Sequence, residues 1–199
     1  MPNFPRFYDF LMARGERGRV GRWRRSTVGA ARGRVLEIGA GTGLDFPHYR
    51  ADTWVVATDP DVGMLERARA RVRDATAGIE LVVADAEALP VRDAAFDEAV
   101  VGLAMCTIPR PAVALTELRR ALRTDGVLRM LEHVRVDHPA WVGLLQDWMT
   151  PVWRRVAGGC HLNRRTVDAV RDAGFASLRV RAHAGGSVLE ISARNPGAA

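Results

Sequence analysis

Between residues 33 and 194, short apolar runs alternate with stretches in which apolar residues recur every three or four positions. The runs are nearly continuous, as expected for strands buried on both faces of a parallel sheet. They predict strands over 34–38, 54–58, 79–84, 96–103 and 127–132. The periodic stretches predict a short helix within 46–50 and longer helices over 62–73, 112–122 and 165–173. Two later runs, 178–182 and 188–193, predict a final strand pair.

This order predicts an α/β fold, a doubly wound seven-stranded Rossmann-like sheet with an antiparallel terminal hairpin. Ligands of such sheets bind at the carboxyl ends of the strands, near the point where the strand order reverses. Three acidic residues, Glu37, Asp59 and Asp85, fall at predicted strand ends, so we expect one shared site there. Two parts are expected: a helical arm over 1–32 and a ligand-binding domain over 33–199.

Three glycines at alternate positions, Gly39, Gly41 and Gly43, follow the first predicted strand. Glycines let the backbone turn sharply and approach a ligand closely. Dinucleotide-binding proteins space these glycines G-x-G-x-x-G beneath a pyrophosphate. Here the third glycine comes one residue early, and Glu37 precedes the first by two. A carboxylate suits a cationic amino group better than a pyrophosphate, so the motif disfavours an NAD-linked oxidoreductase.

The glycine motif resembles motif I of the class I methyltransferases, whose cofactor is S-adenosylmethionine (SAM). The resemblance implies that Glu37 and the glycines hold the amino acid end of SAM. Asp59, about 20 residues further on, suits the ribose hydroxyls; its alternative role is to form a turn before Pro60. Asp85 and Ala86 suit the adenine, although Asp85 could be an ordinary loop residue. The other expected cofactor residues are Pro60, Met64 on the adenine (or in the core), Leu103, and Tyr8, which closes the pocket in similar enzymes.

Wider stretches carry the resemblance over about residues 33–194. Residues 85–90, 96–97 and 118–126 are similar to the ubiquinone/menaquinone-type small-molecule methyltransferases. The second half is most similar to the methyltransferase-like thiol methyltransferases, at Glu132, His133, Val134, Trp141, Gln146, Pro151, Trp153, Gly159, Cys160, Leu162 and Arg164. The resemblance implies a SAM-dependent methyltransferase acting on a small, lipophilic acceptor, with a thiol favoured. A phospholipid or other N-, O- or C-acceptor is the alternative, and SAM binding without turnover stays open.

The acceptor side has fewer candidates. His133 follows the fifth strand and is the expected general base, since a histidine accepts protons near neutral pH; a structural role is equally open. Cys106 and His161 are expected near the acceptor, although Cys106 also suits a small buried position. Trp141, Leu144, Leu145 and Trp148 recur at helical spacing, with Trp153 beyond them. This segment predicts a lid over the acceptor, packing on the sheet, or a helix at a membrane surface.

The chain has 199 residues, a net charge of +6 and arginine as its only basic residue besides histidine. A basic arm (Arg14, Arg17, Arg19, Arg22, Arg24, Arg25) raises the possibility of nucleic acid binding. Residues 103–106 lack the Asn/Asp-Pro-Pro-aromatic motif of base methyltransferases, so no nucleic acid partner is expected.

The two cysteines show no zinc spacing, so no metal is expected. No apolar run reaches the ~18 residues of a membrane span, and we expect a cytoplasmic location. The oligomeric state is left open.

Overall fold

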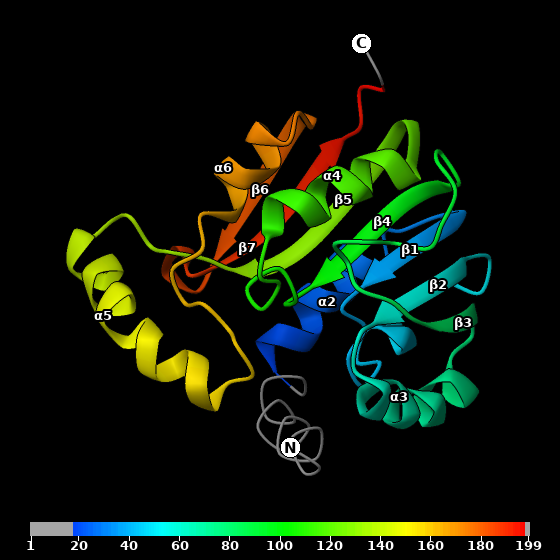
Figure 1. Ribbon diagram of the computed structural model, residues 1–199, viewed down its shortest axis with the longest axis horizontal. Helices are drawn as coiled ribbons and strands as arrows, with labels where there is room; N and C mark the ends of the chain where they lie inside the picture. Colours follow the sequence, from blue (N-terminus) through cyan, green and yellow to red (C-terminus); the bar gives the residue numbers. More distant parts are fainter. Residues whose placement is uncertain (1–17, 198–199) are drawn as a thin grey trace.

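The computed structural model describes residues 18–197 and is built on one seven-stranded sheet (Figure 1). The strands are β1 (Arg34–Ile38), β2 (Trp54–Asp59), β3 (Gly78–Val83), β4 (Phe96–Gly102), β5 (Leu122–His133), β6 (Ala176–His183) and β7 (Val188–Arg194). Their order across the sheet is β3-β2-β1-β4-β5-β7-β6, and β7 runs antiparallel to both its neighbours. The predicted doubly wound sheet and terminal hairpin are therefore confirmed.

Five α-helices are described: α2 (Arg19–Val28), α3 (Val62–Asp74), α4 (Pro111–Ala121), α5 (Ala140–Val156) and α6 (Thr166–Asp172). Single 3-10 turns cover Phe46–His48 and Ala184–Gly186. In Figure 1, α4 and α6 cover one face of the sheet and α3 the other, whereas α5 stands away from both faces. The helix α5 is the predicted amphipathic segment around Trp141 and Trp148.

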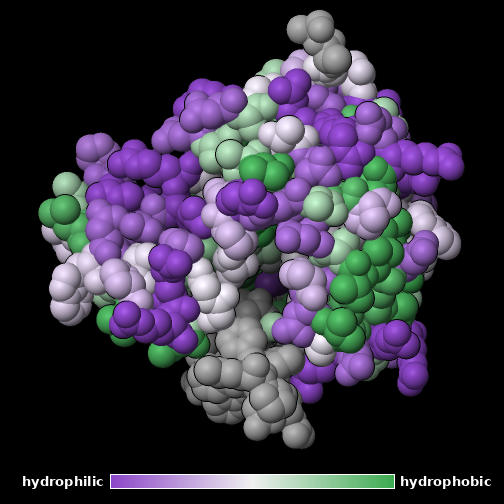
Figure 2. Space-filling view, in the orientation of Figure 1, coloured by the Kyte–Doolittle hydropathy of each residue, from purple (hydrophilic) through white to green (hydrophobic). Residues whose placement is uncertain are grey.

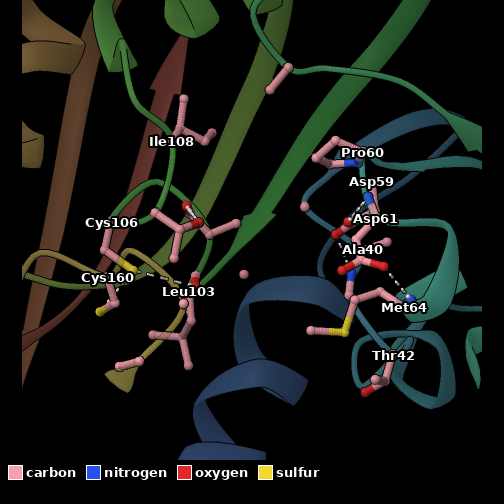
Figure 3. Close-up of a pocket in the computed structure, with 18 of the residues that line it drawn as sticks. Ala40, Thr42, Asp59, Pro60, Asp61, Met64, Leu103, Cys106, Ile108 and Cys160 are labelled. Carbon is pink, nitrogen blue, oxygen red and sulfur yellow. Dashed lines mark hydrogen bonds between the residues drawn. The ribbon is translucent and has the colours of Figure 1, made fainter. Parts of the chain in front are cut away.

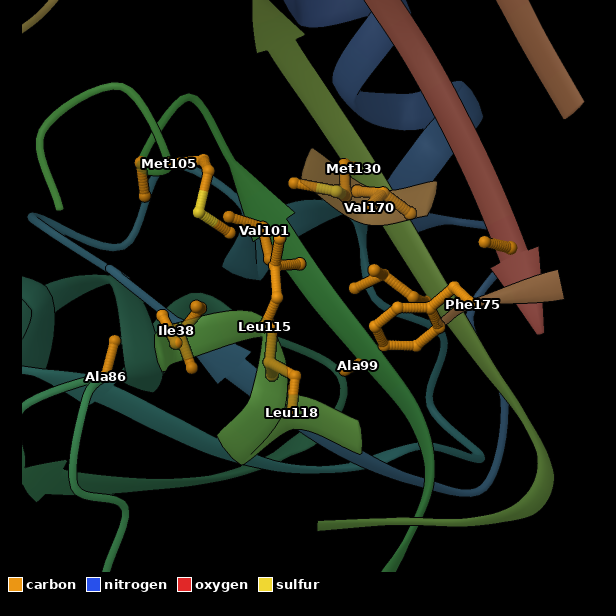
Figure 4. Close-up of a cluster of buried hydrophobic side chains, with 14 of the residues drawn as sticks. Ile38, Ala86, Ala99, Val101, Met105, Leu115, Leu118, Met130, Val170 and Phe175 are labelled. Atoms are coloured by element: carbon orange, nitrogen blue, oxygen red, sulfur yellow. The ribbon is translucent and has the colours of Figure 1, made fainter. Parts of the chain in front are cut away.

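The core has two layers because successive residues of a strand point to opposite faces of the sheet. Leu36 and Ile38 of β1 belong to the same core cluster as Leu115 and Leu118 of α4, and Figure 4 shows Ile38 on the side of the sheet that carries these two leucines. The intervening Val35 joins a second cluster on the opposite face, formed with residues of α3 and β2. Burial on both faces explains why the central strands β1 and β4 appear in the sequence as continuous apolar runs.

Strand β5 begins at Leu122, earlier than the predicted start at 127. The extension carries exposed polar residues, so hydrophobicity alone does not reveal it. Asp125 adopts a left-handed conformation with φ of 61°, and its amide donates to the carbonyl of Asn195 at 2.8 Å. The Asn195 side chain in turn donates to the carbonyl of Leu122 at 2.8 Å. The C-terminal segment therefore fixes this turn.

The described part of the predicted arm packs on the domain. Val28 of α2 is buried in the second core cluster, and Ser26 donates to Glu190 of β7 at 3.1 Å. Arg24 is 2% exposed and forms an ion pair with Asp45 at 2.6 Å. Tyr8 and the first basic residues lie outside the described residues. Within 18–197, no helix is long and apolar enough to cross a bilayer.

Candidate cofactor and acceptor site

A cavity of about 670 Å³ opens at the carboxyl ends of β1, β2 and β4. Figure 3 shows two groups of side chains facing each other across it, one around Asp59 and Met64 and the other around Cys106 and Cys160. The lining includes most of the residues selected from the sequence: Gly39, Gly41, Asp59, Pro60, Met64, Asp85, Ala86, Leu103, Cys106, His133 and Trp153. The expected clustering at strand ends is therefore present in the fold.

The three motif glycines have different structural roles. All three have a positive φ, between 56° and 81°. A Cβ on Gly39 would collide with the Cβ of Ala104, and one on Gly43 would lie 2.6 Å from the ring of Phe46. Gly43 does not line the cavity. A Cβ on Gly41 would meet only the carbonyl oxygen of Gly39, at 4.0 Å. Gly41 therefore leaves open a space that any other side chain would fill.

Asp59 ends β2 and faces the cavity with both carboxylate oxygens fixed. Its Oδ2 accepts from the amide of Gly41 and its Oδ1 from the amide of Asp61, each at 2.9 Å. Burial raises the pKa of Asp59, while these two amides lower it. Each carboxylate oxygen can accept more than one hydrogen bond, so Asp59 can also bind a diol. The Gly41 contact joins the glycine loop to the predicted ribose site.

Met64, Asp85 and Ala86 line the cavity beyond Asp59. Met64 lies in the first turn of α3, and the Asp61 side chain caps that helix by accepting from the amides of Gly63 and Met64. Asp85 is exposed, and its Oδ1 accepts from the amide of Glu87 at 2.9 Å. An apolar side chain next to a carboxylate suits a planar base with an exocyclic amino group, as predicted for adenine.

Glu37 was expected to line the cavity, but its side chain does not reach it. It is 1% exposed, is not among the described lining residues, and accepts from the hydroxyl of Tyr49 at 2.9 Å. Burial raises the pKa of Glu37 well above its usual value, and the nearby Asp45 raises it further. Asp45, two residues after the glycine motif, does line the cavity, as do Asp59, Asp61 and Asp85. Its position in Gly43-Leu44-Asp45 was a signal that the sequence interpretation missed.

Asp45 and Arg24 form a buried pair of opposite charges at the cavity wall. Gly102, at the end of β4, permits this pair, because a Cβ there would collide with Asp45 and lie 2.8 Å from Arg24. A zwitterion, such as the amino acid end of SAM, carries charges complementary to such a pair. The open space at Gly41, the fixed carboxylate of Asp59 and this ion pair together fit SAM.

The opposite end of the cavity contains a cluster of two thiols and an imidazole. His133 Nε2 lies 2.9 Å from Cys160 Sγ, which lies 3.5 Å from Cys106 Sγ. The hydrogen bond between the thiols lowers the pKa of Cys160 to about 4, helped by His133, and raises that of Cys106 well above its usual value. Burial opposes protonation of His133, but its hydrogen bond with Cys160 raises its pKa. His133 and Cys160 therefore form a polar pair facing the cavity.

Glu132, next to His133, organises the loop after β4. Its Oε1 accepts from the amides of Ala104 and Met105, at 3.0 and 2.9 Å. Burial raises the pKa of Glu132 to about 7, although these amides lower it. Leu103, at φ 58°, begins this loop and donates to the carbonyl of Leu131 at 2.7 Å. The loop that carries Cys106 is thus tied to β5, which carries His133.

The predicted acceptor contacts of Trp141 and Trp148 are not present. These side chains are 65% and 77% exposed, and neither lines the cavity. The polar face of α5 is the one that packs on the protein: Gln146 accepts from the amide of Val136 at 2.7 Å and donates to the carbonyl of Leu162 at 3.1 Å. In Figure 2, hydrophobic residues lie along the outer margin of this helix. Its apolar stripe therefore faces outward.

Only the end of α5 reaches the cavity, through Trp153 and Val156. His161, also expected at the acceptor, is not among the described lining residues; its Nδ1 lies 3.0 Å from the carbonyl oxygen of Cys106. The His161 amide donates to the same oxygen at 2.9 Å. His161 thus holds the two cysteine loops together. Cys160, one residue earlier, is the acceptor-side residue that the sequence interpretation left without a role.

Comparisons with known proteins agree with this geometry. A family model described as a methyltransferase domain matches residues 36–130. Thiol S-methyltransferase TMT1B of Homo sapiens is 30% identical over 149 residues, covering 73% of this chain and 61% of the relative. The ubiquinone/menaquinone biosynthesis C-methyltransferase UbiE of Methylobacterium nodulans is 30% identical over 175 residues, covering 77% of this chain and 69% of the relative. A Thermotoga maritima structure described as a SAM-dependent methyltransferase, possible histamine N-methyltransferase, has a TM-score of 0.71 at 21% identity. The match covers 98% of this chain and 97% of that structure's chain.

These matches and the fold agree on one class of protein. The chain belongs to the class I SAM-dependent methyltransferases. It spans about three fifths of the length of the thiol S-methyltransferase it matches (61%). The cofactor of the family, SAM, is the ligand that the Gly41–Asp59 half of the cavity fits.

Proposed function

We propose that this chain transfers a methyl group from SAM to a small lipophilic acceptor, with a thiol as the favoured class. The observation that carries the proposal is one cavity with two chemically different halves. One half carries Gly41, Asp59 and the Arg24–Asp45 pair. The other carries two sulfur atoms, an imidazole and the apolar side chains of Ile108, Trp153 and Val156.

When bound, SAM supplies a methyl group on a positively charged sulfur. In this proposal Asp59 holds the ribose hydroxyls, Met64 packs on the adenine, and Arg24 and Asp45 hold the amino acid end. The methyl group then faces the half of the cavity with the cysteines. Holding an acceptor in line with the methyl group supplies much of the rate acceleration, because effective molarity alone is worth ~7–11 kcal/mol.

The acceptor half suits a sulfur nucleophile. A thiol has an ordinary pKa near ~8.5 and needs little help to ionise, whereas an amine or phenol needs a stronger base. His133 was expected to accept the proton, but its Nε2 contacts Cys160 at 2.9 Å. We assign proton removal to the whole cluster of His133, Cys106 and Cys160. The similarity to thiol S-methyltransferase TMT1B also favours this acceptor class.

The test is transfer of a labelled methyl group from SAM to a short alkyl thiol, with phosphatidylethanolamine as a parallel acceptor. A labelled thioether as the main product supports the proposal. Label in the phospholipid alone would contradict the thiol assignment and favour an N-methyltransferase. An Asp59→Ala variant serves as the negative control, because without its carboxylate the SAM half loses the predicted ribose contact.

A second proposal concerns the outward stripe of α5. Leu144, Leu145, Met149 and Val152 continue the exposed apolar surface of Trp141 and Trp148. Large exposed apolar patches mark interaction sites, and tryptophans together with arginines favour a lipid headgroup region. The exposed Arg154 and Arg155 follow in the same helix. We propose that α5 rests on a membrane surface, from which the chain takes lipophilic acceptors.

Co-sedimentation with vesicles of anionic phospholipid tests this contact. A Trp141→Ser/Trp148→Ser variant is expected to remain in the supernatant, because it loses the two largest exposed apolar side chains. The matched control is Trp54→Ser, which removes an exposed tryptophan (53% exposed) at the start of β2. Equal sedimentation of the α5 variant and the control would exclude the membrane role of the stripe.

A further inference from the structure

Cys106, His133 and Cys160 come from three segments that are distant in sequence. Cys106 follows β4, His133 ends β5, and Cys160 follows α5. Their sulfur and nitrogen atoms nevertheless all lie within 4.8 Å of one another. All three residues line the same cavity. No short spacing motif links them, so sequence analysis had no signal for a shared site.

Two of the three separations are close to those of a tetrahedral zinc site. With Zn–S near ~2.3 Å and Zn–N near ~2.0 Å, two ligand sulfurs lie about 3.8 Å apart and a sulfur and a nitrogen about 3.5 Å apart. The two sulfurs here are 3.5 Å apart, and His133 Nε2 is 2.9 Å from Cys160 Sγ. An ion between them therefore requires the imidazole to move about 0.6 Å away from Cys160 and to turn toward Cys106, whose Sγ lies within 4.8 Å of it.

We propose that Cys106, His133 and Cys160 form a three-ligand site for a thiophilic divalent cation of the zinc class, with the fourth position open to the cavity. Two thiolates and an imidazole select such a cation over calcium or magnesium, which prefer oxygen ligands. Three protein ligands with one open position are the arrangement of catalytic rather than structural zinc sites.

The open position receives the sulfur of the acceptor, a step that rests on the proposed function. With the cation bound, the three side chains would act as ligands and no longer as proton acceptors, and the acceptor's S–H proton would pass to solvent when its sulfur binds. The acceptor sulfur then forms the new S–CH₃ bond while the bond from the methyl group to the cofactor's sulfonium breaks. The products are a thioether and S-adenosylhomocysteine, and the electron pair of the broken bond stays on the cofactor's sulfur. His133 is a ligand in this scheme, which accounts for its Nε2 facing Cys160 instead of open space.

The site is tested by adding Zn²⁺ to the full chain after chelator treatment and measuring zinc retained after dialysis. Wild type is expected to keep one ion per chain, as is His138→Ala, which removes an exposed histidine outside the cavity. His133→Ala and Cys160→Ser are expected to lose it. Removing a residue that merely supports a ligand weakens metal binding about 10–100-fold, so losing a ligand should weaken it more. The site would be overturned if wild type retained no zinc. It would also be overturned if Cys160→Ser retained as much zinc as His138→Ala.

Cobalt provides a second measurement that needs no variant. Co²⁺ added to the chelator-treated wild type is expected to give thiolate-to-cobalt charge-transfer absorption, and its absence would exclude cysteine ligands. Methyl transfer to an alkyl thiol by zinc-loaded and chelator-treated protein then separates the two proposals. If zinc binds but zinc-loaded and chelator-treated protein methylate the thiol at equal rates, the cation has no role in the reaction and the proposed function stands. Zinc binding with no thiol methylated would refute the proposed function and leave the site standing.

Discussion

Replacing Gly41 by alanine should weaken cofactor binding more than tenfold and cost no more stability than its backbone conformation alone explains. Gly41 has φ of 56°, a conformation that costs an alanine about 1–2 kcal/mol. The new Cβ would meet only the oxygen of Gly39, at 4.0 Å, so no packing clash adds to this cost. It would instead stand in the cavity where the backbone is open to a ligand. The substitution therefore separates the folding role of the glycine from its binding role.

The matched control is Gly185→Ala, on the connection between β6 and β7. Gly185 has φ of 68°, and a Cβ there would meet no atom within 4 Å. Both variants should thus lose the same ~1–2 kcal/mol of unfolding free energy, measured by urea titration. Calorimetry with S-adenosylhomocysteine should show unchanged affinity for Gly185→Ala and a loss beyond tenfold, or ~1.4 kcal/mol, for Gly41→Ala.

Two results would refute this reasoning. If Gly41→Ala binds S-adenosylhomocysteine as well as Gly185→Ala does, the glycine loop does not approach the cofactor. If Gly41→Ala unfolds as easily as Gly39→Ala, whose Cβ would collide with Ala104, the space at Gly41 is not open. Gly39→Ala is expected to be the least stable of the three, because its Cβ would collide with the Cβ of the buried Ala104, which cannot rotate away.

Three further predictions concern the charged groups. Arg24→Ala should lose about 3–5 kcal/mol of unfolding free energy, because Asp45 stays buried without this ion pair. The control is Arg25→Ala, which removes an exposed arginine of the same helix, and an equal loss of unfolding free energy in both variants would contradict the argument. Asp59→Asn should weaken S-adenosylhomocysteine binding by about 1.5–3 kcal/mol, the worth of a hydrogen bond to a charged group, and unchanged affinity in calorimetry would exclude the ribose contact. Glu37→Gln should be more stable than wild type at pH 8 in urea unfolding. Burial raises the pKa of Glu37 in the folded state above its unfolded value near ~4.3, so ionisation of Glu37 lowers the unfolding free energy of wild type as pH rises. The difference in unfolding free energy between Glu37→Gln and wild type should therefore disappear below pH ~4. A difference that does not change with pH would refute this reasoning.

The fold and the cofactor half of the site could be predicted because their signals are local in sequence. The central strands β1, β2 and β4 appear as continuous apolar runs, and Gly39, Gly41, Asp59 and Asp85 were predicted just after such runs or at their ends. A doubly wound sheet brings the carboxyl ends of its central strands to one edge, so Gly41, Asp59 and Asp85 had to meet. Glu37 does not reach this edge because it pairs with Ala57 in the β1–β2 register, two residues before Asp59, and so lies deeper in the sheet. Its side chain turns toward Tyr49, and Asp45 takes the place at the cavity wall.

The acceptor half could not be predicted because it depends on which face of α5 packs inward. Helical spacing identified an amphipathic helix, and the usual inference is that its apolar stripe is buried. Gln146 reverses that orientation, since its side-chain amide satisfies backbone groups of the segments before and after the helix. With the polar face docked, Trp148 is left outside and the following loop carries Cys160 to His133. The half-buried Gln146, together with Asp147, which accepts from Arg135 and Asn163, thus holds the polar face inward and leaves the apolar stripe outside. Hydrophobic periodicity shows neither this orientation nor the cysteine–histidine cluster.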